Sequence, residues 1–304
     1  MQKSIGRILR GIGGFYYVEL DDKTIIECKA RGSFRNKSLT PFVGDVVEIE
    51  FNSEDNKGVI VSISQRKNLL IRPAVSNVDR LYIVCSTTLP QPNFFNIDKL
   101  VAIALNNGIE PIIVVSKTDL DEEIAEKLVS TYQKAGFKVY KTNKDSDETA
   151  RQIRKELENN ISVFTGNSGV GKSTFINQLI PSLELKTGEV SLKLSRGKHT
   201  TRHVELFPVQ GGYIADTPGF SSLDFEGVGF IRKEDVVNCF PDIANIEDVC
   251  RFPDCKHIGE RDCAVKKAVE KGEISQSRYE SYCAIFKESE AIKDWETPNK
   301  KGKR

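Results

Sequence analysis

The chain has 304 residues, which predicts one to three domains. Hydrophobic residues make up 39% of it, charged residues 29%, and the net charge is +1, which excludes a uniformly basic nucleic-acid-binding protein but not local basic patches. No window is apolar over the roughly 18 residues that a membrane span needs, and residues 1–7 lack the apolar core of a signal peptide. We therefore expect a cytoplasmic protein that contacts no membrane.

Residues 1–67 contain short strands separated by glycine and charged turns, which predicts a small closed β-barrel, most commonly an OB-fold at this size. The predicted strands are Ile5–Leu9, Tyr16–Leu20, Thr24–Cys28, Val46–Phe51 and Val59–Ile63.

One stretch of this barrel region is basic, contains no acid and includes one phenylalanine. Such a loop suits contact with an RNA backbone and stacking on one base, whereas a solvated charged loop is the alternative. The residues concerned are Lys29, Arg31, Phe34, Arg35 and Lys37.

Residues 68–223 alternate apolar strands with helices, which predicts a parallel sheet covered by helices on both faces. Strands are expected at 81–85, 111–115, 138–140 and 161–164. Helices are expected over 97–105, Glu122–Ala135 and Ser173–Leu179, with a further helix capped by Asp145 and Glu148.

A phosphate-binding loop of the pattern G-x-x-x-x-G-K-[ST] lies between a predicted strand and a predicted helix. Its glycines let N–H groups converge on phosphate oxygens, and the helix N-terminus adds partial positive charge. Lys172 is predicted to reach the outer phosphates and Ser173 to bind magnesium. The predicted nucleotide-binding residues here are Gly166, Asn167, Ser168, Gly169, Val170, Gly171, Lys172, Ser173 and Thr174.

The motif Ser116-Lys117-Thr118-Asp119 follows an apolar strand and matches the N-K-x-D motif with which GTPases read guanine, except that serine replaces asparagine. Asp119 is predicted to accept two hydrogen bonds from guanine that adenine cannot offer. Ser116 shortens the side-chain bridge toward the phosphate loop, so a lower nucleotide affinity is expected.

A D-x-x-G motif follows another short apolar run. Asp216 is predicted on the magnesium side, and the N–H of Gly219 is predicted to sense the terminal phosphate. The polar stretch before it offers Thr200 or Thr201 to magnesium if it is a mobile loop, with a solvated basic turn as the alternative.

Phe220 stands where many GTPases carry the glutamine that orients the attacking water, so slow unaided hydrolysis is expected. His199 is the best candidate to orient the water in place of that glutamine. The alternative is that His199 is a surface histidine or one that contacts RNA. The guanine motif also precedes the phosphate loop, an order that a parallel sheet tolerates by circular permutation. This order places the mobile loops next to the C-terminal segment, so their motion is expected to pull on it.

Three of the seven cysteines and one of the three histidines gather near the C-terminus, in a region expected to be mainly short helices with a basic tail. The pattern C-x4-C-x-H-x5-C, formed by Cys250, Cys255, His257 and Cys263, predicts a closed tetrahedral zinc site of the structural kind.

Taken together, these motifs resemble the RsgA (YjeQ) family of circularly permuted GTPases over essentially the whole chain. The resemblance implies an OB-fold at 1–67, a GTPase domain at 68–223 and a small, mainly α-helical zinc-binding domain at 224–304. We also expect a monomer that uses GTP, GDP, Mg²⁺ and one structural Zn²⁺. The role that the resemblance implies is late maturation of the small ribosomal subunit through contacts with its rRNA, with GTP hydrolysis stimulated by that subunit.

Two other readings stay open. One is a nucleotide-gated RNA-binding module with negligible turnover, and the other is an ATP-dependent enzyme, against which Asp119 argues.

Overall fold

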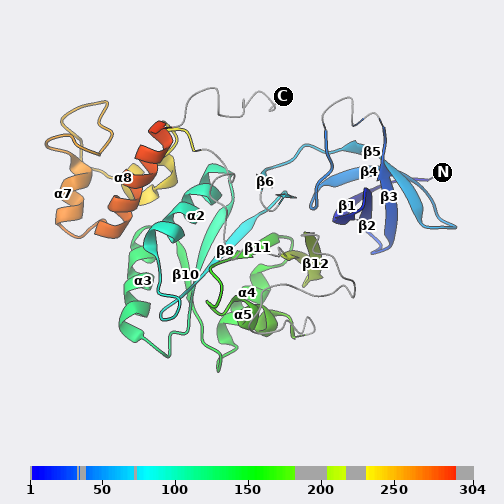
Figure 1. The fold of residues 1–304 in the computed structure, drawn as a ribbon, viewed down its shortest axis with the longest axis horizontal. Helices are drawn as coiled ribbons and strands as arrows, with labels where there is room; N and C mark the ends of the chain where they lie inside the picture. Colours follow the sequence, from blue (N-terminus) through cyan, green and yellow to red (C-terminus); the bar gives the residue numbers. More distant parts are fainter. Residues whose placement is uncertain are drawn as a thin grey trace.

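The computed structural model describes residues 2–32, 34, 39–71, 74–181, 204–216 and 231–291. A barrel formed by the N-terminal strands and a group of C-terminal helices lie on opposite sides of a central α/β layer (Figure 1). Among the residues that the structure describes, no helix is long and apolar enough to cross a membrane.

The N-terminal strands are β1 (Gln2–Ile12), β2 (Phe15–Leu20), β3 (Ile25–Ala30), β4 (Val46–Asn52) and β5 (Lys57–Ile63). They pair in the order β1-β2-β3-β5-β4, and β4 pairs back onto β1, which closes the barrel. Side chains along β4 alternate between half-buried and buried positions, as expected when one face of each strand fills the barrel interior. The predicted barrel and its strands are confirmed.

The central sheet is built from β8 (Arg80–Ser86), β9 (Glu110–Ser116), β10 (Lys138–Lys141), β11 (Ile161–Thr165), β12 (Glu205–Val209) and β13 (Gly212–Asp216). Its order is β10-β9-β8-β11-β13-β12, and all neighbours are parallel except the β12–β13 hairpin. The carboxyl ends of the parallel strands therefore meet at one edge, where α/β sheets bind ligands.

Helices cover both faces of this sheet, as predicted. They are α2 (Phe94–Asn106), α3 (Glu122–Lys134), α4 (Glu148–Glu156) and α5 (Lys172–Leu179). Successive side chains of β8 enter two different apolar clusters, one with α2 and α3 and the other with α4 and α5. Each face of the sheet is thus buried by its own pair of helices.

The predicted start of α4 is wrong. The residue at its N-cap is Asp147, whose side chain makes no capping hydrogen bond. Asp145 instead belongs to a polar turn in which its N–H donates to Asn143 Oδ1 at 3.0 Å. A short hairpin of β6 (Leu69–Ile71) and β7 (Ala74–Ser76) was also not predicted.

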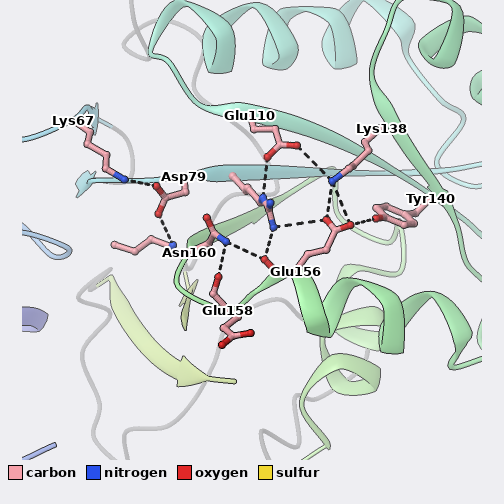
Figure 2. Close-up of polar contacts among 10 residues, drawn as sticks. Lys67, Asp79, Glu110, Lys138, Tyr140, Glu156, Glu158 and Asn160 are labelled. Atoms are coloured by element: carbon pink, nitrogen blue, oxygen red, sulfur yellow. Dashed lines mark hydrogen bonds and ion pairs between the residues drawn. The ribbon is translucent and has the colours of Figure 1, made fainter. Parts of the chain in front are cut away.

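The amino ends of the parallel strands are tied together by a polar network (Figure 2). Arg80 at the start of β8 donates to Glu110 at the start of β9, with 2.9 Å between Nε and Oε2, and also to the backbone oxygen of Glu156. The carboxylate of Glu156 in turn accepts from Lys138 at 3.3 Å and from Tyr140 at 2.5 Å. This network fixes the edge of the sheet opposite to the ligand-binding edge.

The C-terminal helices are η2 (Val237–Cys239), α6 (Pro241–Ala244), α7 (Ala264–Glu270) and α8 (Gln276–Ala291). With 16 residues, α8 is longer than the short helices that we predicted here. It packs against α2, and its fully buried Arg278 forms ion pairs with Asp98 of α2 at 2.8 Å and Asp242 of α6 at 2.7 Å. Burial opposes the charge on Arg278, but the two carboxylates outweigh it and raise the pKa of the guanidinium.

Candidate nucleotide site and metal centre

The phosphate loop leaves β11, whose residues are all buried, and enters α5. A Cβ at Gly166 would lie 2.2 Å from the backbone oxygen of Val84, so only glycine fits there. Gly171, at the N-cap of α5, has a left-handed φ of 93°. The ammonium of Lys172, a residue only 5% exposed, donates to the oxygen of Gly166 at 3.2 Å. The loop therefore curls around its lysine at a helix N-terminus, the geometry that binds phosphate.

Ser116 joins the guanine motif to the phosphate loop. Its side chain is 4% exposed, and its Oγ lies 2.5 Å from the oxygen of Val170 and 3.1 Å from the oxygen of Cys85. A hydroxyl carries one proton, so it donates to one of these acceptors at a time. The bridge that we expected serine to shorten is therefore formed, through the hydroxyl and the backbone of the loop.

The turn after Ser116 is held by the loop that follows β8. Lys117 has a left-handed φ of 56°, and its oxygen accepts from Thr87 Oγ1 at 2.6 Å. Its ammonium donates to the oxygen of Leu89 at 2.5 Å. Asp119 is exposed, so its carboxylate is open to an incoming base.

The loop after β10 lies beside the guanine motif, and its residues were not predicted to belong to the site. The oxygen of Thr142 accepts from the N–H of Thr118 at 3.4 Å, and the Gln178 side chain of α5 donates to the oxygen of Asn143 at 3.1 Å. The loops after β9 and β10 are thus joined to each other, and the second is joined to the helix of the phosphate loop. The signal in the sequence was that Thr142 directly follows a strand, at the end where parallel sheets place ligand-binding residues.

Asp216 ends β13, next to the strand that carries the phosphate loop, because Ala215 pairs with Val163 of β11. The structure describes its backbone but not its side chain. His199, Thr200 and Thr201 lie outside the described residues, as do Gly219 and Phe220, so their roles stay predictions.

The Cys/His cluster is brought together as predicted. Its four donor atoms, from Cys250, Cys255, His257 and Cys263, lie within 4.8 Å of one another. The distances from His257 Nδ1 to the sulfurs of Cys250 and Cys263 are 3.5 and 3.4 Å. Bond lengths of about 2.0–2.3 Å to a tetrahedral zinc ion separate its ligand atoms by about 3.3–4 Å, so the cluster fits one zinc ion. Burial lowers the pKa of His257, which favours the neutral imidazole that binds metals.

Helix α8 holds the loop that carries these ligands. Tyr279 donates its hydroxyl proton to the oxygen of His257 at 2.8 Å, and Tyr282 donates to the oxygen of Lys256 at 2.8 Å. The N–H of Ala264, at the start of α7, donates to Cys250 Sγ at 3.3 Å. The cluster is therefore anchored to the same helix that packs on α2.

The basic stretch of the barrel borders an open hollow of about 480 Å³, lined by Tyr16, Lys29, Arg31 and Phe34 among others. Lys29 and Arg31 are exposed, but Phe34 is only 8% exposed. Stacking on Phe34 therefore requires a base to enter the hollow. Arg35 and Lys37 lie outside the described residues.

The arrangement defines a class of protein. A phosphate loop follows β11, a guanine-reading motif bonded to it follows β9, and β9 comes first along the chain. This is a P-loop GTPase with a circularly permuted motif order.

Comparisons with known proteins agree. The family model described as RsgA GTPase matches residues 63–226, and the model described as RsgA N-terminal domain matches residues 5–60. A curated relative from Caldanaerobacter subterraneus subsp. tengcongensis, named small ribosomal subunit biogenesis GTPase RsgA, is 43% identical over 95% of this chain and 96% of its own. A relative of the same name from Alkaliphilus metalliredigens is 45% identical over 94% and 97%.

Solved structures show the same fold. YjeQ from Thermotoga maritima matches with a TM-score of 0.80 and 33% identity, over 96% of this chain and 100% of that one. YloQ, described as a circularly permuted GTPase, matches with a TM-score of 0.77 and 33% identity, over 95% and 96%. The chain belongs to the RsgA GTPase family and is a GTP-hydrolysing enzyme.

Proposed function

We propose that this GTPase acts in the cytoplasm, where it binds the small ribosomal subunit and hydrolyses GTP during late maturation of that subunit, with turnover stimulated by it. The observation that carries the proposal is the site in which Ser116 bonds the guanine motif to the phosphate loop. Relatives named small ribosomal subunit biogenesis GTPase, which align with nearly the whole chain, supply the partner.

Each site residue receives a role in this proposal. The phosphate loop from Gly166 to Thr174, together with Gly219, holds the phosphates, and the motif from Ser116 to Asp119 binds guanine. Ser173, Asp216 and one of Thr200 and Thr201 would hold Mg²⁺, which neutralises charge on the phosphates. His199 orients the attacking water, so His199→Ala should lower stimulated turnover more than nucleotide affinity.

The remaining parts support binding rather than chemistry. We assign residues 1–67 to rRNA contact through Lys29, Arg31, Phe34, Arg35 and Lys37, and residues 68–223 to the GTPase domain. Residues 224–304 form a zinc-binding domain whose ion is structural, because four protein ligands leave no open position. Purified protein, as a monomer, should contain one zinc ion per chain, and a value well below one contradicts this assignment.

A second candidate function is a nucleotide-gated RNA-binding module with negligible turnover. Phe220 in place of a water-orienting glutamine favours it. In this alternative GTP changes conformation only, and subunits bind without accelerating hydrolysis.

Co-sedimentation with purified small and large ribosomal subunits tests the choice of partner. We expect the protein to sediment with small subunits in the presence of a non-hydrolysable GTP analogue, and much less with GDP. The variant Lys172→Ala, which loses a phosphate contact, should lose this nucleotide dependence. Equal sedimentation with both subunits, or none with the small subunit, would contradict the proposal.

A further inference from the structure

The β12–β13 hairpin lies between two segments that are predicted to contact the nucleotide or its magnesium ion. The segment before it, 182–203, contains Thr200 and Thr201, one of which is predicted to bind magnesium, and the segment after it, 217–230, contains Gly219, the predicted phosphate sensor. The same hairpin is the part of the central sheet that reaches the barrel, because β12 pairs with β1. A displacement of the barrel against the central sheet therefore acts on this hairpin, as it does on the segment before β8, where Ser76 and Asn77 donate to the oxygens of Val43 and Gly44.

One contact between barrel and hairpin is weak. Arg10 of β1 is opposite Glu205 of β12, and Glu205 is opposite Asp216 of β13, so the three residues form one row across the sheet. The ion pair from Arg10 to Glu205 measures 3.5 Å, and both side chains are more than a third exposed. Solvent screens such a pair, so it contributes little by itself.

The second contact is shorter and better shielded from solvent. The hydroxyl of Tyr213 donates to Glu19 Oε2 at 2.5 Å, and the side chain of Glu19 is only 6% exposed. Arg7, which is opposite Glu19 in the barrel, lies 5.5 Å from the centre of the Tyr213 ring, and Lys23 lies 3.3 Å from the carboxylate. Hydrogen bonds to a buried charged acceptor are among the stronger ones in proteins.

Tyr213 is also attached on its other side. Its N–H donates to the oxygen of Asn160 at 2.9 Å, directly before the strand that leads into the phosphate loop. Burial and the bond to Glu19 raise the pKa of Tyr213 to about 12, so the phenol keeps its proton near neutral pH. A strand advances about 3.3 Å per residue, so Asp216 lies about 10 Å along the same stiff segment.

We propose that Tyr213 is a positioning residue, which through Glu19 transmits the engagement of the barrel by RNA to the hairpin and so sets the position of Asp216. This inference rests on the proposed function, since it takes RNA as the ligand of the barrel and Asp216 as a magnesium-side group. Coupling between two sites is reciprocal, so the nucleotide state also changes the affinity of the barrel for its ligand.

A matched control lies inside the barrel. Tyr17 donates its hydroxyl proton to Glu27 at 3.1 Å, and both residues belong to neighbouring barrel strands. The substitution Tyr17→Phe removes a bond of the same chemistry within the barrel, and it keeps the ring that lies 4.1 Å from the guanidinium of Arg10. Comparing it with Tyr213→Phe separates transmission from general damage to the barrel.

The test measures GTP turnover with and without purified small subunits for wild type, Tyr213→Phe, Glu19→Gln and Tyr17→Phe. We expect Tyr213→Phe and Glu19→Gln each to lower the stimulation factor by about tenfold, the size expected for one hydrogen bond to a charged acceptor. The loss should appear in kcat and not in KM for GTP. The variant with both substitutions should be stimulated as much as either single variant, and Tyr17→Phe should be stimulated as much as wild type. Full stimulation in Tyr213→Phe, or equal losses in Tyr213→Phe and Tyr17→Phe, would overturn the inference.

A second measurement keeps this inference separate from the proposed function. If small subunits do not stimulate the wild-type protein, the proposed function is wrong. Hydrogen exchange measured without subunits then tests the coupling between the barrel and the nucleotide site. Amide exchange in β1 and β2 that differs between the GDP-bound and GTP-analogue-bound wild type, but not in Tyr213→Phe, supports transmission through Tyr213. Exchange that responds equally to the nucleotide in both proteins overturns it.

Discussion

Ser116 connects the two halves of the nucleotide site, and it does so from a buried position. Where asparagine would use an amide, this chain uses a single hydroxyl proton shared between Val170 and Cys85. The bridge is therefore present but rests on one donor.

Removing that donor should weaken nucleotide binding. We expect Ser116→Ala to raise the dissociation constants of GTP and GDP by about fivefold to tenfold, the usual size of one buried hydrogen bond. Titration with a fluorescent guanine nucleotide measures it. Ser162→Ala is the control, because Ser162 is a fully buried serine of the same sheet whose Oγ has no hydrogen-bond partner within the described structure. Unchanged affinity in Ser116→Ala would show that the bridge has no influence on binding.

Asp119 should decide which base is bound. In Asp119→Asn the amide still accepts one bond but now donates where guanine also donates, so GTP affinity should fall by about a hundredfold or more. The same amide can donate to the oxygen that xanthine carries in place of the guanine amino group. Competition between guanosine and xanthosine triphosphates checks this. A variant that still prefers GTP would mean that another group reads the base.

At the scale of elements, α2 joins the nucleotide site to the C-terminal helices. It begins in the loop that holds Lys117, and it carries Asp98, which forms the buried ion pair with Arg278 of α8. The rings of Phe137 and Phe240 lie 5.3 and 4.6 Å from that guanidinium. A buried charge of this kind is tolerated only while its partners remain in place.

Loss of one partner should therefore be costly. We expect Asp98→Ala to lower the free energy of unfolding by about 3 kcal/mol, because it leaves part of the Arg278 charge uncompensated in the interior. Urea unfolding measures the change. Glu288→Ala removes the more exposed bridge from Lys99 to Glu288 between the same two helices, and it should cost less than about 1 kcal/mol. Equal losses in the two variants would mean that burial does not govern this interface.

The features that were predicted from the sequence are those encoded within short segments. The phosphate loop, the guanine motif and the Cys/His cluster each combine special residues at close spacing, and the barrel strands are bounded by glycine and charged turns. The bond from Tyr213 to Glu19 joins residues 194 positions apart, and the bond from Arg278 to Asp98 spans 180. No local pattern specifies such pairs, since each partner alone is an ordinary polar residue. The start of α4 was predicted wrongly because several polar residues there compete to cap the helix.

At the scale of the whole molecule, β12 of the hairpin pairs with β1 of the barrel, and along the chain the predicted phosphate sensor precedes the C-terminal helices. The nucleotide site thus lies between the barrel, attached through Tyr213, and the Cys/His cluster, attached through α8 to α2. Such an arrangement suits an enzyme whose turnover depends on the binding of a large partner. It suits an enzyme that converts a metabolite less well. The expectation that loop motion pulls on the C-terminal region stays a prediction, because the connecting segment 217–230 lies outside the described residues.

The most direct test of the account is phosphate release from GTP and from ATP, measured in parallel with and without purified small ribosomal subunits. We expect slow GTP hydrolysis by the free protein, an increase of about tenfold or more with small subunits, and no comparable increase with ATP. Equal use of ATP would contradict the guanine-reading role of Asp119. GTP turnover that does not respond to small subunits would contradict the central claim that this enzyme is switched by its ribosomal partner.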